Sequence, residues 1–223
     1  MTTRRLLPVS LTVLLVFFLA LPSARAESWW LQAGWTHSDV GLADEGDGFW
    51  TGVEGRQVLG GNTLELAYSV AYVQKAGSQV MLFSDVNEGN RLGRAEVTLH
   101  VLEPMVTIGA VMDAGPFRIK LYGGGAVGLK LSEQWDQPPG AADRTYSYEN
   151  LDLAGVTGLD LRRGAWLVTV LYSAGLLDQL LTEGVAPVSK SSQAEDPLGG
   201  SSLPVAGQNI ACWRLGVGYR FGG

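Results

Sequence analysis

The chain has 223 residues, with 16 Lys+Arg against 22 Asp+Glu, a formal net charge of −6 and one cysteine. Its 46% hydrophobic content excludes a disordered chain, and the single Cys212 excludes a disulfide framework. The acidic balance argues against nucleic acid as a partner, because nucleic-acid-binding proteins carry a basic face. Only 17% of the residues are charged and 30 are Gly, which favours a β-protein with one face in an apolar medium.

The N-terminal segment has the pattern of a signal peptide. Two arginines precede an apolar run over 6–21, and a small-residue cleavage site, Ala24 and Ala26, follows it. The run is short for a membrane-spanning helix, so a retained helical anchor is the less favoured alternative. We therefore predict a helical signal peptide over 1–26 that is cleaved, and one exported domain over 27–223. Cleavage would remove three arginines and change the net charge from −6 to −9.

After this segment, apolar and polar residues alternate with a period of two. Such alternation is typical of β-strands, because successive side chains point to opposite faces. In 63–73, for example, Leu64 and Leu66 fall on one face, and Glu65 and Ala67 fall on the other. The seventh predicted strand is apolar on both faces, so its orientation stays open. The alternation predicts eight strands, at about 28–38, 48–60, 63–73, 95–111, 117–131, 149–162, 165–177 and 210–221.

The connections between these strands alternate between long and short. The long ones are predicted at 39–47, 76–94, 133–148 and 178–208, and the short ones at 60–62, 113–116 and 163–164. Outer-membrane barrels join an even number of antiparallel strands by short periplasmic turns and long extracellular loops. Each strand has the roughly ten residues that a tilted strand needs to cross a bilayer. The sequence therefore predicts an all-β fold, an eight-stranded antiparallel up-and-down transmembrane β-barrel in the outer membrane of a Gram-negative-type cell.

A soluble barrel of the lipocalin type closes in the same way and is the alternative. Eight strands leave a lumen wide enough only for side chains or one small ligand. Large residues such as Trp29, Leu121 and Phe221 are too bulky and numerous for this lumen, so we expect them to face lipid. The charged residues on the opposite faces are six acids and seven bases, which we expect to pair in a filled lumen: Glu54, Arg56, Glu65, Glu96, Glu103, Arg118, Lys120, Lys130, Asp152, Asp160, Arg162, Arg214 and Arg220.

Aromatic residues gather near both ends of the predicted strands. Membrane barrels carry two girdles of such rings at the headgroup levels, whereas aromatics scattered through a β-sandwich core are the alternative. The predicted periplasmic girdle contains Trp29, Phe117, Trp166, Tyr219 and Phe221, and the predicted outer girdle contains Trp35, Phe49, Tyr72 and Trp213.

Several segments, taken in order, resemble the outer-membrane β-barrel domain family, the PorT-like group of small OmpX/OmpA-sized barrels. They are TLELAYSVAYVQKAG, VLEPMVTIGAV, FRIKLYGGGAVGLKLS, LDLAGVTGLDL, LVTVLYSAGLLDQL and RLGVGYRF. The resemblance implies a signal peptide, a small eight-stranded barrel and a final aromatic strand that the barrel-assembly machinery recognises. This sequence departs from the family by placing Gly222 and Gly223 after Phe221. The family brings no catalytic residues.

Residues suited to catalysis or metal binding are few. His37 and His100 have no Cys, His or carboxylate at metal-ligand spacing, so we expect hydrogen-bonding roles at a strand end or in the lumen. A triad of Ser69, His100 and Asp160 could be composed, but only geometry could establish it. The acidic stretch 39–47 lacks the ligand spacing of an EF-hand, and we expect a solvated loop, although cation binding there stays open.

These observations favour a structural or surface-interaction barrel that is not an enzyme, with no cofactor and no metal. Its expected partners are outer-membrane lipid, the barrel-assembly machinery through the last strand, and an unidentified extracellular ligand, with the protein itself a monomer. One alternative is an outer-membrane enzyme, lipid-modifying or protease-like. The other is a narrow passive pore, which eight strands scarcely permit.

Overall fold

The computed structural model describes residues 26–40, 44–59, 63–85, 89–136, 146–148, 150–176, 180–182 and 210–222. The predicted signal peptide, apart from its last residue, lies outside this part of the chain. The described residues include no helix long and apolar enough to cross a membrane. They form the strands β1 (Ser28–Asp39), β2 (Asp44–Leu59), β3 (Leu64–Asp85), β4 (Gly89–Ala114), β5 (Phe117–Asp136), β6 (Tyr146–Tyr148), β7 (Leu151–Arg163), β8 (Trp166–Gly175), β9 (Leu180–Thr182) and β10 (Ala211–Gly222).

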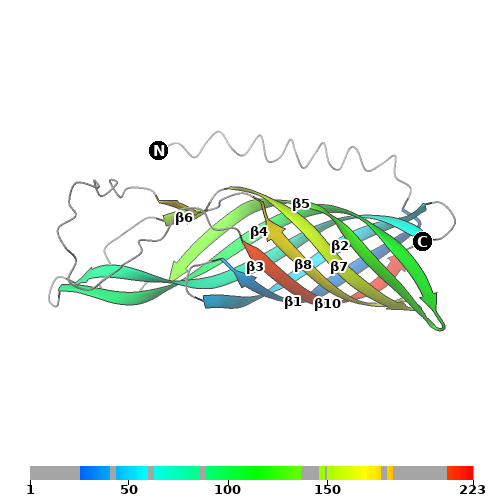
Figure 1. The fold of residues 1–223 in the computed structure, drawn as a ribbon, viewed down its shortest axis with the longest axis horizontal. Helices are drawn as coiled ribbons and strands as arrows, with labels where there is room; N and C mark the ends of the chain where they lie inside the picture. The colour runs from blue at the N-terminus through cyan, green and yellow to red at the C-terminus, as the bar shows by residue number, and fades with distance from the viewer. Residues whose placement is uncertain are drawn as a thin grey trace.

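Eight of these strands close into a barrel in the order β1-β10-β8-β7-β5-β4-β3-β2 (Figure 1). Every neighbouring pair is antiparallel, and β1 pairs with β10 to complete the ring. The short strands β6 and β9 pair with each other in a separate sheet. The predicted eight-stranded up-and-down barrel is therefore confirmed.

Two tight turns lie at the end of the barrel that we call the turn end; the opposite end is the loop end. Gly115 and Gly164 have φ values of +63° and +62°, which L side chains adopt only with strain. Each occupies the first position of a two-residue hairpin loop. In the first loop Pro116 follows Gly115, and the proline ring holds its φ near −65°. A positive φ followed by a negative φ matches a type II′ turn, whose geometry suits the right-handed twist of the two paired strands.

Two of the predicted long loops are wrong. The segment 39–47 is mostly strand, because β2 begins at Asp44, and 76–94 is almost entirely strand, because β3 and β4 stay paired as far as Asp85 and Gly89. The paired ends of β3 and β4 project past the other strands at the loop end (Figure 1). The sequence suggested loops there because polar residues interrupt the lipid-facing alternation, but a strand in water can continue with polar residues on its outer face.

The barrel is apolar outside and polar inside. Leu121 and Val217 are 51% and 58% exposed on the outer face, whereas Lys120 on the adjacent inward position is 1% exposed. In β8, whose orientation the sequence left open, Leu167 points inward and Trp166 outward. A soluble barrel needs the opposite arrangement, so the outward apolar belt is the surface of a membrane-spanning barrel.

Large rings also enter the lumen where glycines leave room for them. A Cβ added to Gly216 would lie 2.4 Å from the indole of Trp50, and one added to Gly158 would lie 2.4 Å from the ring of Tyr122. Both rings are buried. The high glycine content therefore serves the packing of the lumen as well as its turns.

Candidate functional site

The buried charges of the lumen form two groups. The first, which we call the turn-side network, draws its residues from four strands, β2, β3, β5 and β7. Arg56 donates to Asp160 at 2.7 Å and also contacts Glu54. Glu65 accepts from Arg162 at 2.8 Å and lies 3.2 Å from the Lys120 ammonium. The network contains three acids and three bases: Glu54, Arg56, Glu65, Lys120, Asp160 and Arg162.

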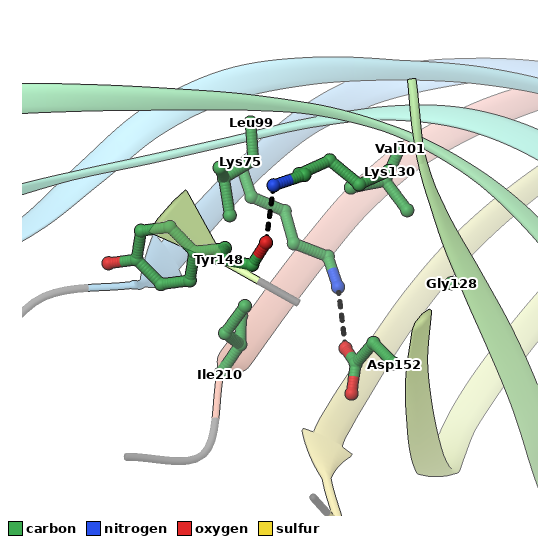
Figure 2. A pocket seen from close by; sticks show the side chains of 8 residues that line it. All are labelled: Lys75, Leu99, Val101, Gly128, Lys130, Tyr148, Asp152 and Ile210. Atoms are coloured by element: carbon green, nitrogen blue, oxygen red, sulfur yellow. Dashed lines mark hydrogen bonds and ion pairs between the residues drawn. The ribbon is translucent and has the colours of Figure 1, made fainter. Parts of the chain in front are cut away.

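The second group, the loop-side network, lies nearer the loop end and consists of Lys75, Glu103, Asp152 and Arg214. The Lys75 ammonium is 3.5 Å from a carboxylate oxygen of Glu103. It is also 3.5 Å from a carboxylate oxygen of Asp152 (Figure 2). Arg214 of β10 donates across the lumen to Glu103 of β4. This network again balances, with two acids and two bases.

Balance within each network is what burial requires. Arg56 is 1% exposed, and Arg214 is 2% exposed. A charge removed from water is costly unless it is paired and hydrogen-bonded, and removing one partner leaves the other uncompensated. Each network has no net charge and joins side chains from several strands, so it holds those strands together across the lumen.

An apolar cluster covers the loop side of these networks. Its buried members are Val40, Val97, Leu99, Val101, Tyr148 and Ile210. The Tyr148 hydroxyl donates to the carbonyl of Val40, and burial raises the pKa of this hydroxyl, so the phenol stays neutral. Lys130 donates to the Tyr148 carbonyl (Figure 2). Its ammonium also lies 2.6 Å from a carboxylate oxygen of Glu133. Among the described residues, the loop end is therefore closed by this apolar cluster together with the Lys130–Glu133 ion pair.

Little open space separates the two networks. The cavity between them, beside Trp50 and Tyr122, measures about 20 Å³, room for about one water molecule. A second cavity, lined by Lys75, Tyr148 and Asp152, measures about 10 Å³ (Figure 2). The described residues thus leave little space around the two networks, whereas the turn end opens into a larger cavity.

The structure distributes the predicted lumen residues unevenly. Arg118 and Arg220 lie at the turn-end mouth, where Arg118 pairs with Asp113 at 3.5 Å and Arg220 is exposed. Lys130 pairs with Glu133 at the loop end. The two networks contain the other predicted residues except one: Glu54, Arg56, Glu65, Glu103, Lys120, Asp152, Asp160, Arg162 and Arg214.

The prediction for Glu96 is wrong, and Lys75 was missed. Glu96 is exposed, because β4 keeps one alternation that buries Val97 and Leu99 inside the barrel. The rule that polar residues face inward fails at the loop end, where an apolar cluster fills the lumen and water meets the outer face. Lys75 has the same inward parity as Glu65, but the predicted strand ended two residues before it.

The aromatic residues lie at two levels on the outer face. At the turn end, Trp166 packs edge-on against Tyr219 with a centroid separation of 5.3 Å, and the ring of Phe117 lies 5.5 Å from the Arg163 guanidinium. Trp29 and Phe221 are exposed at the same end. At the loop end, the ring contacts are Phe49–Tyr72 at 5.5 Å, Tyr172–Trp213 at 4.7 Å and Trp35–His37 at 5.4 Å.

Among the described residues, the two histidines make hydrogen bonds and do not form the triad considered above. His37 lies at a strand end between Asp47 at 2.8 Å and Glu45 at 2.5 Å. His100 contacts the hydroxyl of Tyr72 on the outer face, whereas Ser69 and Asp160 are buried inside, so this triad does not assemble. Among the described residues, no group of three or more His, Cys, Asp or Glu side chains is arranged to hold a metal ion.

No family model and no curated protein match the sequence. Two of the solved structures to which the chain is similar illustrate the likeness. One is Ail, the attachment invasion locus protein of Yersinia pestis, in complex with the heparin analogue sucrose octasulfate: 16% identity over 87% of this chain and 99% of that chain, with a TM-score of 0.43. The other is Neisserial surface protein A, at 11% identity over 86% and 97% of the two chains, also with a TM-score of 0.43.

What places this chain among the outer-membrane β-barrels is its own architecture, a closed ring of eight antiparallel strands with an apolar belt outside and buried charges inside.

Proposed function

We propose that the protein is a small structural or surface-interaction barrel of the outer membrane that does not conduct ions. The observation that supports this most strongly is the pair of neutral networks, which cross the lumen from β2 to β7 and from β4 to β10. A passive pore needs a continuous hydrated path, and paired charges with cavities of about 10 and 20 Å³ are poorly suited to one.

The loop end is the side that we propose faces the outside of the cell. This agrees with the short turns at 115–116 and 164–165 on the opposite end, since periplasmic turns are short in bacterial barrels. In this orientation the β3–β4 hairpin and the segments 137–145 and 183–209 would meet an extracellular ligand. The PorT-like resemblance, the recognition of Phe221 by the assembly machinery and the monomeric state are parts of the same proposal.

Conductance across a planar bilayer tests the closed lumen. The refolded full chain should resist dodecyl sulfate until boiled and should give no steady single-channel current. An engineered variant, Lys75→Ala with Arg214→Ala, serves as the comparison because it removes both cations of the loop-side network. A stable current of porin size from the wild-type protein would refute the closed lumen and favour the pore.

Capture experiments on intact cells test the surface role. Cells carrying the wild-type protein should retain a ligand that cells lacking 183–209 lose, with equal amounts of folded barrel in both. Equal retention in the two strains would argue against this loop as a binding element and favour a purely structural role.

A further inference from the structure

The turn end of the lumen opens into a cavity of about 310 Å³ that three arginines line from three different strands. They are Arg118 of β5, Arg162 of β7 and Arg220 of β10. Among the described lining residues, Asp113 is the single carboxylate; it lies 3.5 Å from Arg118 and its side chain is 77% exposed. Water screens a pair this exposed. Because the turn-side network already balances the charge of Arg162, the excess positive charge of the described mouth comes from Arg118 and Arg220 against Asp113.

Arg162 gives the strongest indication of a ligand at this mouth, because it is buried and two of its N–H donor groups have no hydrogen-bond partner among the described residues. It is 7% exposed, and its Nη1 donates to Glu65 at 2.8 Å, but neither Nε nor Nη2 has a hydrogen-bond partner among the described residues. Glu65 is also contacted by Arg56 and Lys120, so it cannot compensate Arg162 alone. Buried charged donors without partners are costly, and these two belong to a side chain that lines the cavity.

The strand register adds a second reason to expect an anion. Arg118 and Arg162 are directly opposite each other in the β5–β7 ladder, and like charges at such positions repel. The backbone N–H of Arg220 donates to the carbonyl of Ala165 at 2.9 Å, which holds the end of β10 against the β7–β8 turn. The backbone of the third arginine is thereby fixed at the mouth, and its side chain lines the same cavity as the other two. An anion between them would offset their repulsion.

We propose that this cavity binds a phosphate-type oxyanion through Arg118, Arg162 and Arg220. Planar guanidinium groups donate in pairs to tetrahedral oxyanions, which suits three arginines around one space. Phe117 lines the cavity and also belongs to the turn-end aromatic residues, which mark the headgroup level in membrane barrels. The phosphate therefore comes from a lipid headgroup or from a solute on the turn-end side of the membrane.

Titration of inorganic phosphate into the full chain tests this site. The protein is refolded in a phosphate-free, non-ionic detergent, and binding is followed by ³¹P NMR line broadening. We expect saturable binding that Arg162→Gln and Arg220→Gln each weaken by about tenfold or more, the effect of losing a charged hydrogen bond. The matched control is Arg163→Gln, an exposed neighbour on the outer face, which should leave the affinity unchanged.

Two lipid environments then distinguish the sources of phosphate. If nanodiscs of phosphatidylglycerol abolish the binding of free phosphate while nanodiscs of a phosphate-free galactolipid preserve it, the occupant is a headgroup; binding in both identifies a solute. If Arg162→Gln fails the heat-modifiability test for folding, Arg220→Gln decides, because Arg220 lies outside both networks. No saturable binding in detergent, or an equal loss in Arg163→Gln, would overturn the proposal.

Discussion

Replacing Arg214 with alanine removes one of the two cations of the loop-side network. Glu103 and Asp152 then face Lys75 alone, whose ammonium is 3.5 Å from both carboxylates, too far for a short charged hydrogen bond. Glu103 is 1% exposed, so water cannot replace the lost partner. Removing one member of a buried pair costs about 3–5 kcal/mol, and we expect the free energy of unfolding to fall by about that amount.

Urea unfolding of the refolded chain in micelles, followed by tryptophan fluorescence, measures this loss. The matched control Arg163→Ala removes an exposed arginine above Phe117 and should cost no more than about 1 kcal/mol. The double variant Glu103→Leu with Arg214→Met removes both charges and should recover most of the stability, because replacing a buried pair by apolar residues is often neutral. A loss below about 1 kcal/mol in Arg214→Ala, or a double variant that is equally unstable, would refute the reasoning.

Three further predictions concern the belt, the packing of the lumen and the orientation. Leu66→Arg places a charge on the lipid-facing side and should cost about 2–4 kcal/mol in vesicle refolding assays, whereas the uncharged Leu66→Ala should cost clearly less; equal losses would contradict a lipid-facing position for Leu66. Gly158→Ala should destabilise the barrel by about 1–3 kcal/mol because its Cβ would meet Tyr122, whereas Gly155→Ala, with open space around it, should be neutral by the same unfolding measurement. An epitope tag near Ser192 should be accessible on intact cells and one at Gly115 only after permeabilisation, and the reverse result would invert the orientation.

The alternation in the sequence was sufficient to predict the barrel and much of its interior. Residues such as Glu54, Glu65 and Asp160 lie where the outer face meets lipid, so polar side chains there can only face inward. Glu96 lies nearer the loop end, where water replaces lipid and this constraint disappears, whereas Lys75 obeys the rule but lies beyond the end of the predicted strand. The change from lipid to water at the loop end also explains why β2 begins at Asp44, before its predicted start at 48.

The pairing of the charges could not be predicted from the alternation. Parity assigns Arg56 and Asp160 to the lumen but does not place them at the same depth, because depth depends on the stagger of strands around the closed ring. That stagger includes a bulge between His100 and Val101, where one extra residue of β5 is accommodated. Pro104 of β4 causes no such shift, because β4 pairs with β3 in one continuous register from Glu103 to Met105.

The bonds that cross the lumen have a consequence for how the protein assembles. Arg56 and Asp160 are 104 residues apart in the chain, and Glu103 and Arg214 are 111 apart. Such contacts cannot form until nearly all strands are present, and β10, which carries Arg214, is the last of them. A half-built sheet would expose its unpaired carboxylates and guanidinium groups to hydrocarbon. Insertion and ring closure are therefore expected to occur as one cooperative event, in which the final strand completes both the backbone seam and the charge balance.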